Sequence, residues 1–174
     1  MTLVYLSIGS NIDAENHIRQ CAIDLAVAFT DRVWSPVYRS AAVGMTGDDF
    51  LNAVVQTRTK LAVNELLDKL TEFESAHGRV RSKNKFTSRT LDIDLLLYGD
   101  QIINTDRVTI PREEITTAAH VLVPLVDIAG TTLHPTLGLT FAELLEQLKK
   151  SNTNTVSKLD DINLDLSNAL EGYC

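Results

Sequence analysis

The chain has 174 residues, 44% of them hydrophobic and 22% charged, and this composition excludes a largely disordered protein. The length suits one domain with a real core and is marginal for two. The formal net charge of −7 argues against a general nucleic-acid binder, because such proteins usually present a basic face.

The first forty residues predict a strand, a helix and a second strand. Residues 3–8 (LVYLSI) indicate a buried strand, which a turn at residues 9–11 (GSN) would end. An apolar stripe at helical spacing predicts a helix over residues 13–29. Residues 32–40 (RVWSPVYRS) predict a strand in which Pro36 indicates an edge or a bulge.

A loop, a strand and a helix are predicted next. Residues 40–49 (SAAVGMTGDD) are small and rich in glycine, which indicates a mobile loop. Residues 50–59 (FLNAVVQTRT) alternate and predict a strand that places Phe50 and Asn52 on one face. Residues 64–78 predict a helix that ends with a glycine at its C′ position.

The second half begins with a basic loop over residues 79–89 and a strand over residues 91–99. It continues with a short strand at 102–111, a helical segment at 112–129, a turn at 134–138 and a helix at 141–150. The order of elements predicts an α+β fold, a ferredoxin-like βαββαβ core with a mainly antiparallel sheet and helices packed on it. We expect residues 1–150 to form a single domain and residues 151–174 a C-terminal extension, either a strand or a loose tail.

Targeting segments are not expected. No apolar stretch approaches the roughly 18 residues of a membrane span, and the first residues lack a basic leader with a long apolar region. Cys21 and Cys174 cannot form a disulfide framework, and no Cys/His spacing indicates a zinc site. We therefore expect a cytoplasmic protein without a signal peptide.

Positive charge is concentrated in one segment of this acidic chain. Five of the 16 cations fall within the eleven positions from residue 79 to residue 89, and no acidic residue lies between Glu74 and Asp92. Such a charge run is often a solvated loop. Its position directly before two aspartates favours a functional role instead.

Asp92 and Asp94 stand in an apolar run, SRTLDIDLLLYG, which otherwise suits the core. Side chains alternate along a strand, so the two carboxylates point to the same face. Mg²⁺ suits this pair, because it binds one or two carboxylates together with substrate phosphates. The alternative is that each aspartate pairs with a nearby arginine, such as Arg89.

A metal at these carboxylates and the neighbouring basic loop could hold a polyphosphate between them, since arginine offers bidentate donors to phosphate oxygens. The sequence contains no GxxxxGK[ST], GxSxG, HExxH or GxGxxG motif. We therefore interpret the pattern as metal-assisted phosphoryl or pyrophosphoryl transfer.

Several motifs together resemble one enzyme family of folate biosynthesis. The segments GRVRSKNKFTSRTLDIDLLLYG, IGSN, FLNAVV and INTDRVTIP are similar to 6-hydroxymethyl-7,8-dihydropterin pyrophosphokinase, over residues 2–149. The resemblance implies a ferredoxin-like core and transfer of the β,γ-diphosphate of ATP to the hydroxymethyl group of the pterin, with release of AMP. It also implies two Mg²⁺ ions that bridge the ATP phosphates and the paired aspartates.

The resemblance further implies individual site residues. Asn52 matches an amide that hydrogen-bonds the pterin, and Phe50 matches an aromatic ring that stacks on it. The implied catalytic residues are Arg79, Arg89, Asp92 and Asp94, of which the two aspartates bind metal. The implied ATP-binding residues are Leu67, Glu74, Arg79, Arg81, Arg89, Leu95, Arg107, Thr109 and Arg112. The implied pterin-binding residues are Ser40, Val43, Phe50, Asn52, Phe86 and His120.

The chain departs from the family pattern at the loops and the pterin side. Residues 86–88 (FTS) stand where the family usually has Trp, Gly and Pro, and residues 40–42 (SAA) replace a proline-bearing stretch. Arg112 stands where a histidine usually faces the phosphates, which keeps a cation and loses a titratable group. His120 stands where a second aromatic residue stacks on the pterin. We therefore expect the substrate to be held less tightly than usual.

Three alternatives stay open at this point. A catalytically weakened paralogue could bind nucleotide or pterin, and another Mg²⁺-dependent phosphoryl-transfer enzyme could use the same scaffold. A nucleic-acid module built on the basic loop is disfavoured by the net charge. The expected partners are small molecules, ATP and hydroxymethyldihydropterin, with no nucleic acid and no membrane, and we expect a monomer.

Overall fold

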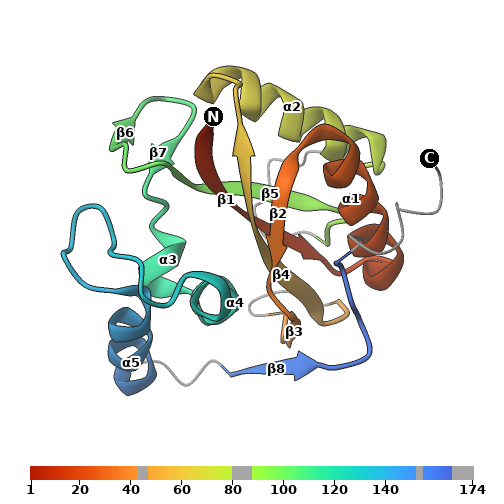
Figure 1. The fold of residues 1–174 in the computed structure, drawn as a ribbon. Coiled ribbons are helices and arrows are strands. Elements are labelled where there is room, and N and C mark those ends of the chain that lie inside the picture. The colour runs from red at the N-terminus through yellow and green to blue at the C-terminus, as the bar shows by residue number, and fades with distance from the viewer. Residues whose placement is uncertain (43–46, 80–87, 152–154, 166–174) are drawn as a thin grey trace.

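A six-stranded antiparallel sheet lies between two layers of helices in the computed structural model of this chain (Figure 1). The structure describes residues 1–42, 47–79, 88–151 and 155–165. Three of the predicted site residues, Val43, Arg81 and Phe86, lie outside the described residues.

The strand order confirms the ferredoxin-like core. The sheet has the order β5-β1-β4-β3-β8, β2 also pairs with β4, and every pairing is antiparallel. A separate hairpin consists of β6 and β7. The strands are β1 (Thr2–Ser10), β2 (Thr30–Trp34), β3 (Val37–Ser40), β4 (Phe50–Thr59), β5 (Asp92–Tyr98), β6 (Ile103–Asn104), β7 (Thr109–Ile110) and β8 (Val156–Leu159).

The helices divide between the two faces of the sheet (Figure 1). One face carries α1 (Ala14–Ala28) and α2 (Val63–Ala76), and the other carries α3 (Glu114–Thr117), α4 (Ala119–Ala129) and α5 (Phe141–Ser151). A hydrophobic core lies on each face of the sheet, and the side chains of β1 alternate between the two. Leu6 and Ile8 pack with α1 and α2, whereas Tyr5 packs with α4 and α5. None of the described helices combines the length and the apolar character that a membrane crossing requires.

The predicted turn at residues 9–11 is wrong for its first two residues. Strand β1 continues to Ser10, since Gly9 pairs with Asn52 of β4 on one side and with Asp92 of β5 on the other. Backbone hydrogen bonding to two neighbouring strands therefore overrides the local turn signal of glycine and serine.

Three other predicted elements are each divided in the structure. The strand over residues 32–40 is split into β2 and β3 around Ser35 and Pro36, as the proline suggested. The helical segment is split into α3 and α4 at Ala118, and residues 102–111 form the hairpin β6–β7. The helix end at Gly78 is confirmed, because this C′ residue has a φ of 73°.

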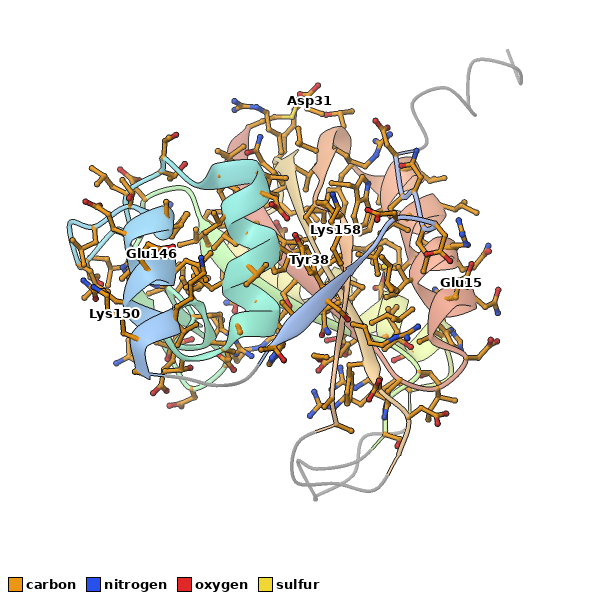
Figure 2. All side chains as sticks on the ribbon, turned by 90° about the horizontal axis from the view of Figure 1, so that it is seen from below. Glu15, Asp31, Tyr38, Glu146, Lys150 and Lys158 are labelled. Carbon is orange, nitrogen blue, oxygen red and sulfur yellow. The ribbon has the colours of Figure 1, made fainter. Side chains whose placement is uncertain are left out.

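The described part of the C-terminal segment packs onto the sheet. Strand β8 pairs with β3, and Lys158 lies opposite Tyr38, as Figure 2 shows from below. Beyond β8, Ile162 and Leu164 are buried in the core that contains α1 and α2. Residues 156–165 thus run from the edge of the sheet into the core on the side of α1 and α2.

Candidate active site

Strand β5 presents Asp92 and Asp94 on one face, as their spacing predicts. Ile93, between them, points to the opposite face and is buried in the core with α1 and α2. In the neighbouring strand, Gly9 is the register partner of Asp92 and Ser7 is that of Asp94. The two carboxylates therefore stand side by side on β5, in the part of the strand that pairs with β1 before the register shifts between Leu6 and Tyr5.

Asp92 is the centre of a chain of ion pairs. Nη1 of Arg79 donates hydrogen bonds to both Asp92 and Glu74, and Nη1 of Arg89 donates to the other oxygen of Asp92. Glu74 is only 4% exposed, and its Oε1 also accepts a 3.0 Å hydrogen bond from the backbone N–H of Ile93. Glu74 therefore ties α2 to β5 and fixes Arg79 beside Asp92.

Asp94 has an arginine partner of its own. Nη2 of Arg112 donates a 2.7 Å hydrogen bond to Oδ1 of Asp94, and the same nitrogen lies 3.4 Å from Oε1 of Glu114. Burial raises the pKa of Asp94, the charge of Asp92 raises it further, and Arg112 lowers it. Asp94 is thus a carboxylate that an additional cation would help to ionise.

The structure therefore shows the arginine pairing that the sequence left open as an alternative. Guanidinium groups contact both aspartates, and they come from the loop before β5 and from the segment before α3. This pairing is compatible with phosphate binding, because arginines gathered at one strand end can redirect their donors to phosphate oxygens.

The carboxylate pair also fits a small, hard divalent cation. It offers oxygen ligands alone, as Mg²⁺ prefers, and its second carboxyl group has a raised pKa. The described residues contain no cluster of three or more histidine, cysteine, aspartate or glutamate side chains that could hold a metal. An ion at this pair would therefore share its coordination with water or substrate oxygens.

A glycine separates the carboxylates from the predicted pterin-binding amide. Gly9 pairs with Asp92 and with Asn52, so these three residues form one row across β5, β1 and β4. A Cβ atom placed on Gly9 would lie 3.5 Å from Oδ1 of Asn52 and 4.0 Å from Cδ1 of Phe50. The absence of a side chain at Gly9 thus leaves room for about one more atom at ordinary contact distance from Asn52 and Phe50.

The predicted pterin-binding residues Ser40 and Asn52 contact each other. Nδ2 of Asn52 donates a 2.9 Å hydrogen bond to the hydroxyl oxygen of Ser40, and Asn52 is 5% exposed. Phe50 is half-buried and lies opposite Ser40 in the pairing of β3 with β4. The structure therefore brings these three residues together at the ends of two adjacent strands.

His120, the other predicted pterin-binding residue among those described, lies at the start of α4. It is the second residue of α4, and the surrounding protein lowers the pKa of its imidazole by desolvation, although the residue keeps an exposed surface. The charges of Glu114 and Asp92 oppose this shift. The charged groups around the two aspartates therefore influence the imidazole of His120.

Asn11 is a site residue that the sequence interpretation missed. Its Nδ2 donates 3.2 Å hydrogen bonds to the backbone oxygen of Asp48 and to the hydroxyl oxygen of Ser88. Its Oδ1 accepts a 2.7 Å hydrogen bond from the backbone N–H of Arg89. Asn11 is 3% exposed, and it joins the segment before β4 to the segment before β5. Only the IGSN motif marked its position in the sequence.

The remaining predicted ATP-binding residues come from α2, β5 and the hairpin β6–β7. Leu95 is buried in the core on the face opposite the carboxylates, and Leu67 of α2 packs against the same core. Nη2 of Arg107 lies 2.6 Å from Oδ1 of Asp68, which links the hairpin β6–β7 to α2. Thr109 is exposed on β7. The structure thus links Arg107 to α2, whereas Leu95 is part of the core and Thr109 lies on the surface of the hairpin.

Comparison with known proteins adds sequence relatives. The family model of 7,8-dihydro-6-hydroxymethylpterin-pyrophosphokinase (HPPK) matches residues 5–130. A Haemophilus influenzae protein named 2-amino-4-hydroxy-6-hydroxymethyldihydropteridine pyrophosphokinase is 33% identical over 151 residues, which cover 84% of this chain and 93% of that protein. A Synechocystis protein of the same name is 40% identical over 111 residues, covering 64% of this chain and 56% of the relative.

Solved structures share the fold. Wild-type Plasmodium falciparum HPPK-DHPS matches 94% of this chain with a TM-score of 0.64 and 12% sequence identity. A triple mutant of the same protein matches 90% of the chain with a TM-score of 0.68 and 11% identity. This chain spans about half the length of these solved chains, namely 50% and 45%. At such low identity the likeness concerns the fold alone.

Proposed function

The chain belongs to the 7,8-dihydro-6-hydroxymethylpterin-pyrophosphokinase family, and we propose that the charged groups around Asp92 and Asp94 are its catalytic centre. The enzyme transfers diphosphate from ATP to the hydroxymethyl group of 6-hydroxymethyl-7,8-dihydropterin in folate biosynthesis. The hydroxymethyl oxygen attacks the β-phosphorus of ATP. The bond from the β-phosphorus to the oxygen bridging it to the α-phosphate breaks, and AMP leaves with that bonding pair.

We assign the binding of Mg²⁺ to Asp92 and Asp94, with two ions expected by family resemblance. The oxygen-only ligand set and the raised pKa of Asp94 support this assignment. When bound, the metal would neutralise charge on the ATP phosphates. The residues beside it have a separate task, which is to orient the phosphate chain.

The guanidinium groups supply that orientation. Arg79 contacts one oxygen of the Asp92 carboxylate and Arg89 contacts the other, so both guanidinium groups stand at the strand end that carries the carboxylates. Guanidinium donors stabilise charge that develops on the transferring group. No side chain with an evident general-base role is required, because this transfer depends mainly on positioning and electrostatics.

We place the pterin on the row that continues from Asp92 through Gly9 to Asn52. The Asn52 amide supplies a donor and an acceptor for the heterocycle, and Phe50 supplies a ring face. The spacing of sheet strands is about 4.8 Å, so Asn52 lies roughly 10 Å across the sheet from the carboxylate strand. That separation suits a substrate whose hydroxymethyl group must reach the phosphates.

One observation carries the proposal: three arginines, two from the loop before β5 and one from the segment before α3, contact two aspartates on the same strand face. The purified chain, incubated with Mg²⁺, ATP and 6-hydroxymethyl-7,8-dihydropterin, should form AMP and pterin diphosphate in equal amounts. Omission of the pterin provides the control. Formation of ADP instead of AMP would indicate a different phosphoryl transfer, and no nucleotide product would indicate a binding protein.

We further propose that the protein acts in the cytoplasm as a monomer. The one described cysteine, Cys21, is buried as a free thiol, which suits a reducing compartment. The two substrates are small molecules. Sedimentation or light scattering of the purified protein tests the oligomeric state.

A further inference from the structure

Arg112 makes an incomplete contact with Asp94. Only Nη2 faces the carboxylate, and this one nitrogen is shared between Asp94 at 2.7 Å and Glu114 at 3.4 Å. Among the described residues, Nε of Arg112 is buried without a hydrogen-bond partner. A guanidinium group that pairs fully with a carboxylate uses two parallel donors. Arg112 therefore keeps unused donors at the edge of the site.

The backbone of Arg112 is fixed while its side chain has room to move. Its N–H donates a 3.1 Å hydrogen bond to the carbonyl oxygen of Leu96 on β5, two residues beyond Asp94. Its side chain is 27% exposed, so it borders solvent on one side. A change of partner by Arg112 thus needs only rotation of the side chain.

Arg112 also occupies an oxygen that a metal ion would need. Among the described residues, it is the only cation within 4 Å of the Asp94 carboxylate, whereas Asp92 has two arginine partners. A divalent ion bound to Asp94 would face this guanidinium at close range, and the like charges would repel. A phosphate group arriving with the metal would accept the displaced donors.

We propose that Arg112 is an exchangeable counter-ion, which holds Asp94 until metal and nucleotide arrive together and then transfers its donors to the phosphates. The inference rests on the proposed function and adds to it that metal and nucleotide bind together rather than metal first. Metal alone must compete with Arg112 for Asp94, whereas metal with nucleotide gives Arg112 a new partner. Metal and nucleotide therefore strengthen each other's binding through one side chain.

Binding of Mn²⁺, measured by electron paramagnetic resonance without nucleotide, tests the exchange. Arg112→Gln should bind Mn²⁺ about tenfold more tightly than the wild-type chain, the change expected for removal of one charge-assisted competitor. Arg112→Lys keeps the positive charge and should stay close to the wild type. Arg19→Gln, which breaks an exposed pair with Glu15 on α1, is the matched control and should have no effect.

The second measurement is binding of α,β-methylene-ATP at saturating Mn²⁺. The analogue carries a methylene group in place of the bridging oxygen that leaves with AMP, so it is not consumed. Arg112→Gln should weaken its binding by about tenfold, because the phosphates lose a guanidinium partner. Circular dichroism of each variant confirms that the fold is retained.

Unchanged or weaker binding of Mn²⁺ alone to Arg112→Gln would overturn the exchange. This result is separable from failure of the proposed function. A wild-type chain that forms AMP from ATP and pterin while Arg112→Gln binds Mn²⁺ no more tightly would refute the inference alone. A wild-type chain that forms no AMP would refute the proposed function first.

Discussion

The side chain of Asn11 accepts a 2.7 Å hydrogen bond from the backbone N–H of Arg89, whose guanidinium group contacts Asp92. The same amide donates to the backbone of Asp48 and to the hydroxyl group of Ser88. One buried side chain thus sets the position of an arginine at the proposed catalytic centre. It also ties that arginine to the segment that precedes the pterin-side strand β4.

Asn11→Ala should therefore impair catalysis through the position of Arg89. We expect kcat for AMP release to fall by up to about 100-fold, since small displacements of charge-stabilising groups have effects of that size. Leaving the N–H of Arg89 without a partner should also lower the free energy of unfolding by about 1–3 kcal/mol. Steady-state kinetics and urea unfolding check both effects. Asn16→Ala, which removes only an exposed hydrogen bond to Asp13, should change neither.

Asp94→Ala should abolish turnover while the fold survives. The substitution removes an assigned metal ligand, and we expect AMP release to fall by at least about 100-fold. Stability should change little, because the loss of the Arg112 contact is offset by relief of the crowding between Asp94 and Asp92. Product chromatography and thermal unfolding measure the two quantities. Retained activity would contradict the assigned site, and Glu15→Ala on α1 serves as the control carboxylate.

Arg89→Ala should slow the chemical step itself. Loss of one group that stabilises developing charge costs about 100- to 1000-fold in rate. The single-turnover rate of AMP formation at saturating ATP and pterin isolates this step from product release. Arg89→Lys should recover part of the rate, because it keeps the charge and loses the planar donor geometry. An undiminished rate in Arg89→Ala would leave this residue without its proposed role.

Gly9→Val should reduce pterin binding. Its Cβ would make ordinary contacts of 3.5 Å with Asn52 and 4.0 Å with Phe50, and the two methyl groups beyond it would fill the space beside them. We expect KM for the pterin to rise about tenfold while KM for ATP changes little. Gly9→Ala adds only the Cβ and is the matched control, expected to resemble the wild type. An unchanged KM for the pterin in Gly9→Val would place the pterin elsewhere.

His134 should make stability depend on pH. Burial lowers its pKa, and its Nδ1 accepts a 3.3 Å hydrogen bond from the backbone N–H of Thr136, which requires the neutral ring. The unfolded chain therefore binds more protons once the pH falls below about 6.5, so stability is lost on acidification. The urea midpoint should decrease from pH 7 to pH 5, and less so in His134→Gln. Equal decreases in both proteins would contradict this role of His134.

The sequence was sufficient to predict features that depend on local periodicity. Alternation along a strand placed Asp92 and Asp94 on one face, and a glycine after an amphipathic run marked the end of α2. The order of strands and helices predicted the ferredoxin-like core, because few topologies accommodate βαββαβ with short connections.

Features that depend on distant partners could not be predicted in the same way. Gly9 belongs to a strand only because Asn52 of β4 and Asp92 of β5 pair on its two sides, against its local preference for a turn. The hydrogen bonds of Asn11 and the pairing of Arg112 with Asp94 likewise join segments far apart in the chain. No local pattern encodes contacts of this kind.

The two borders of the sheet also bear on self-association. At the border formed by β5, the carboxylate of Glu74 accepts the hydrogen bond of the Ile93 N–H, which an incoming strand would otherwise use. At the other, β8 covers β3 and presents a short, lysine-bearing strand to solvent. The carboxylate that fixes Arg79 beside Asp92 thus also removes one backbone donor from the outer edge of β5, where a strand of another molecule would otherwise pair.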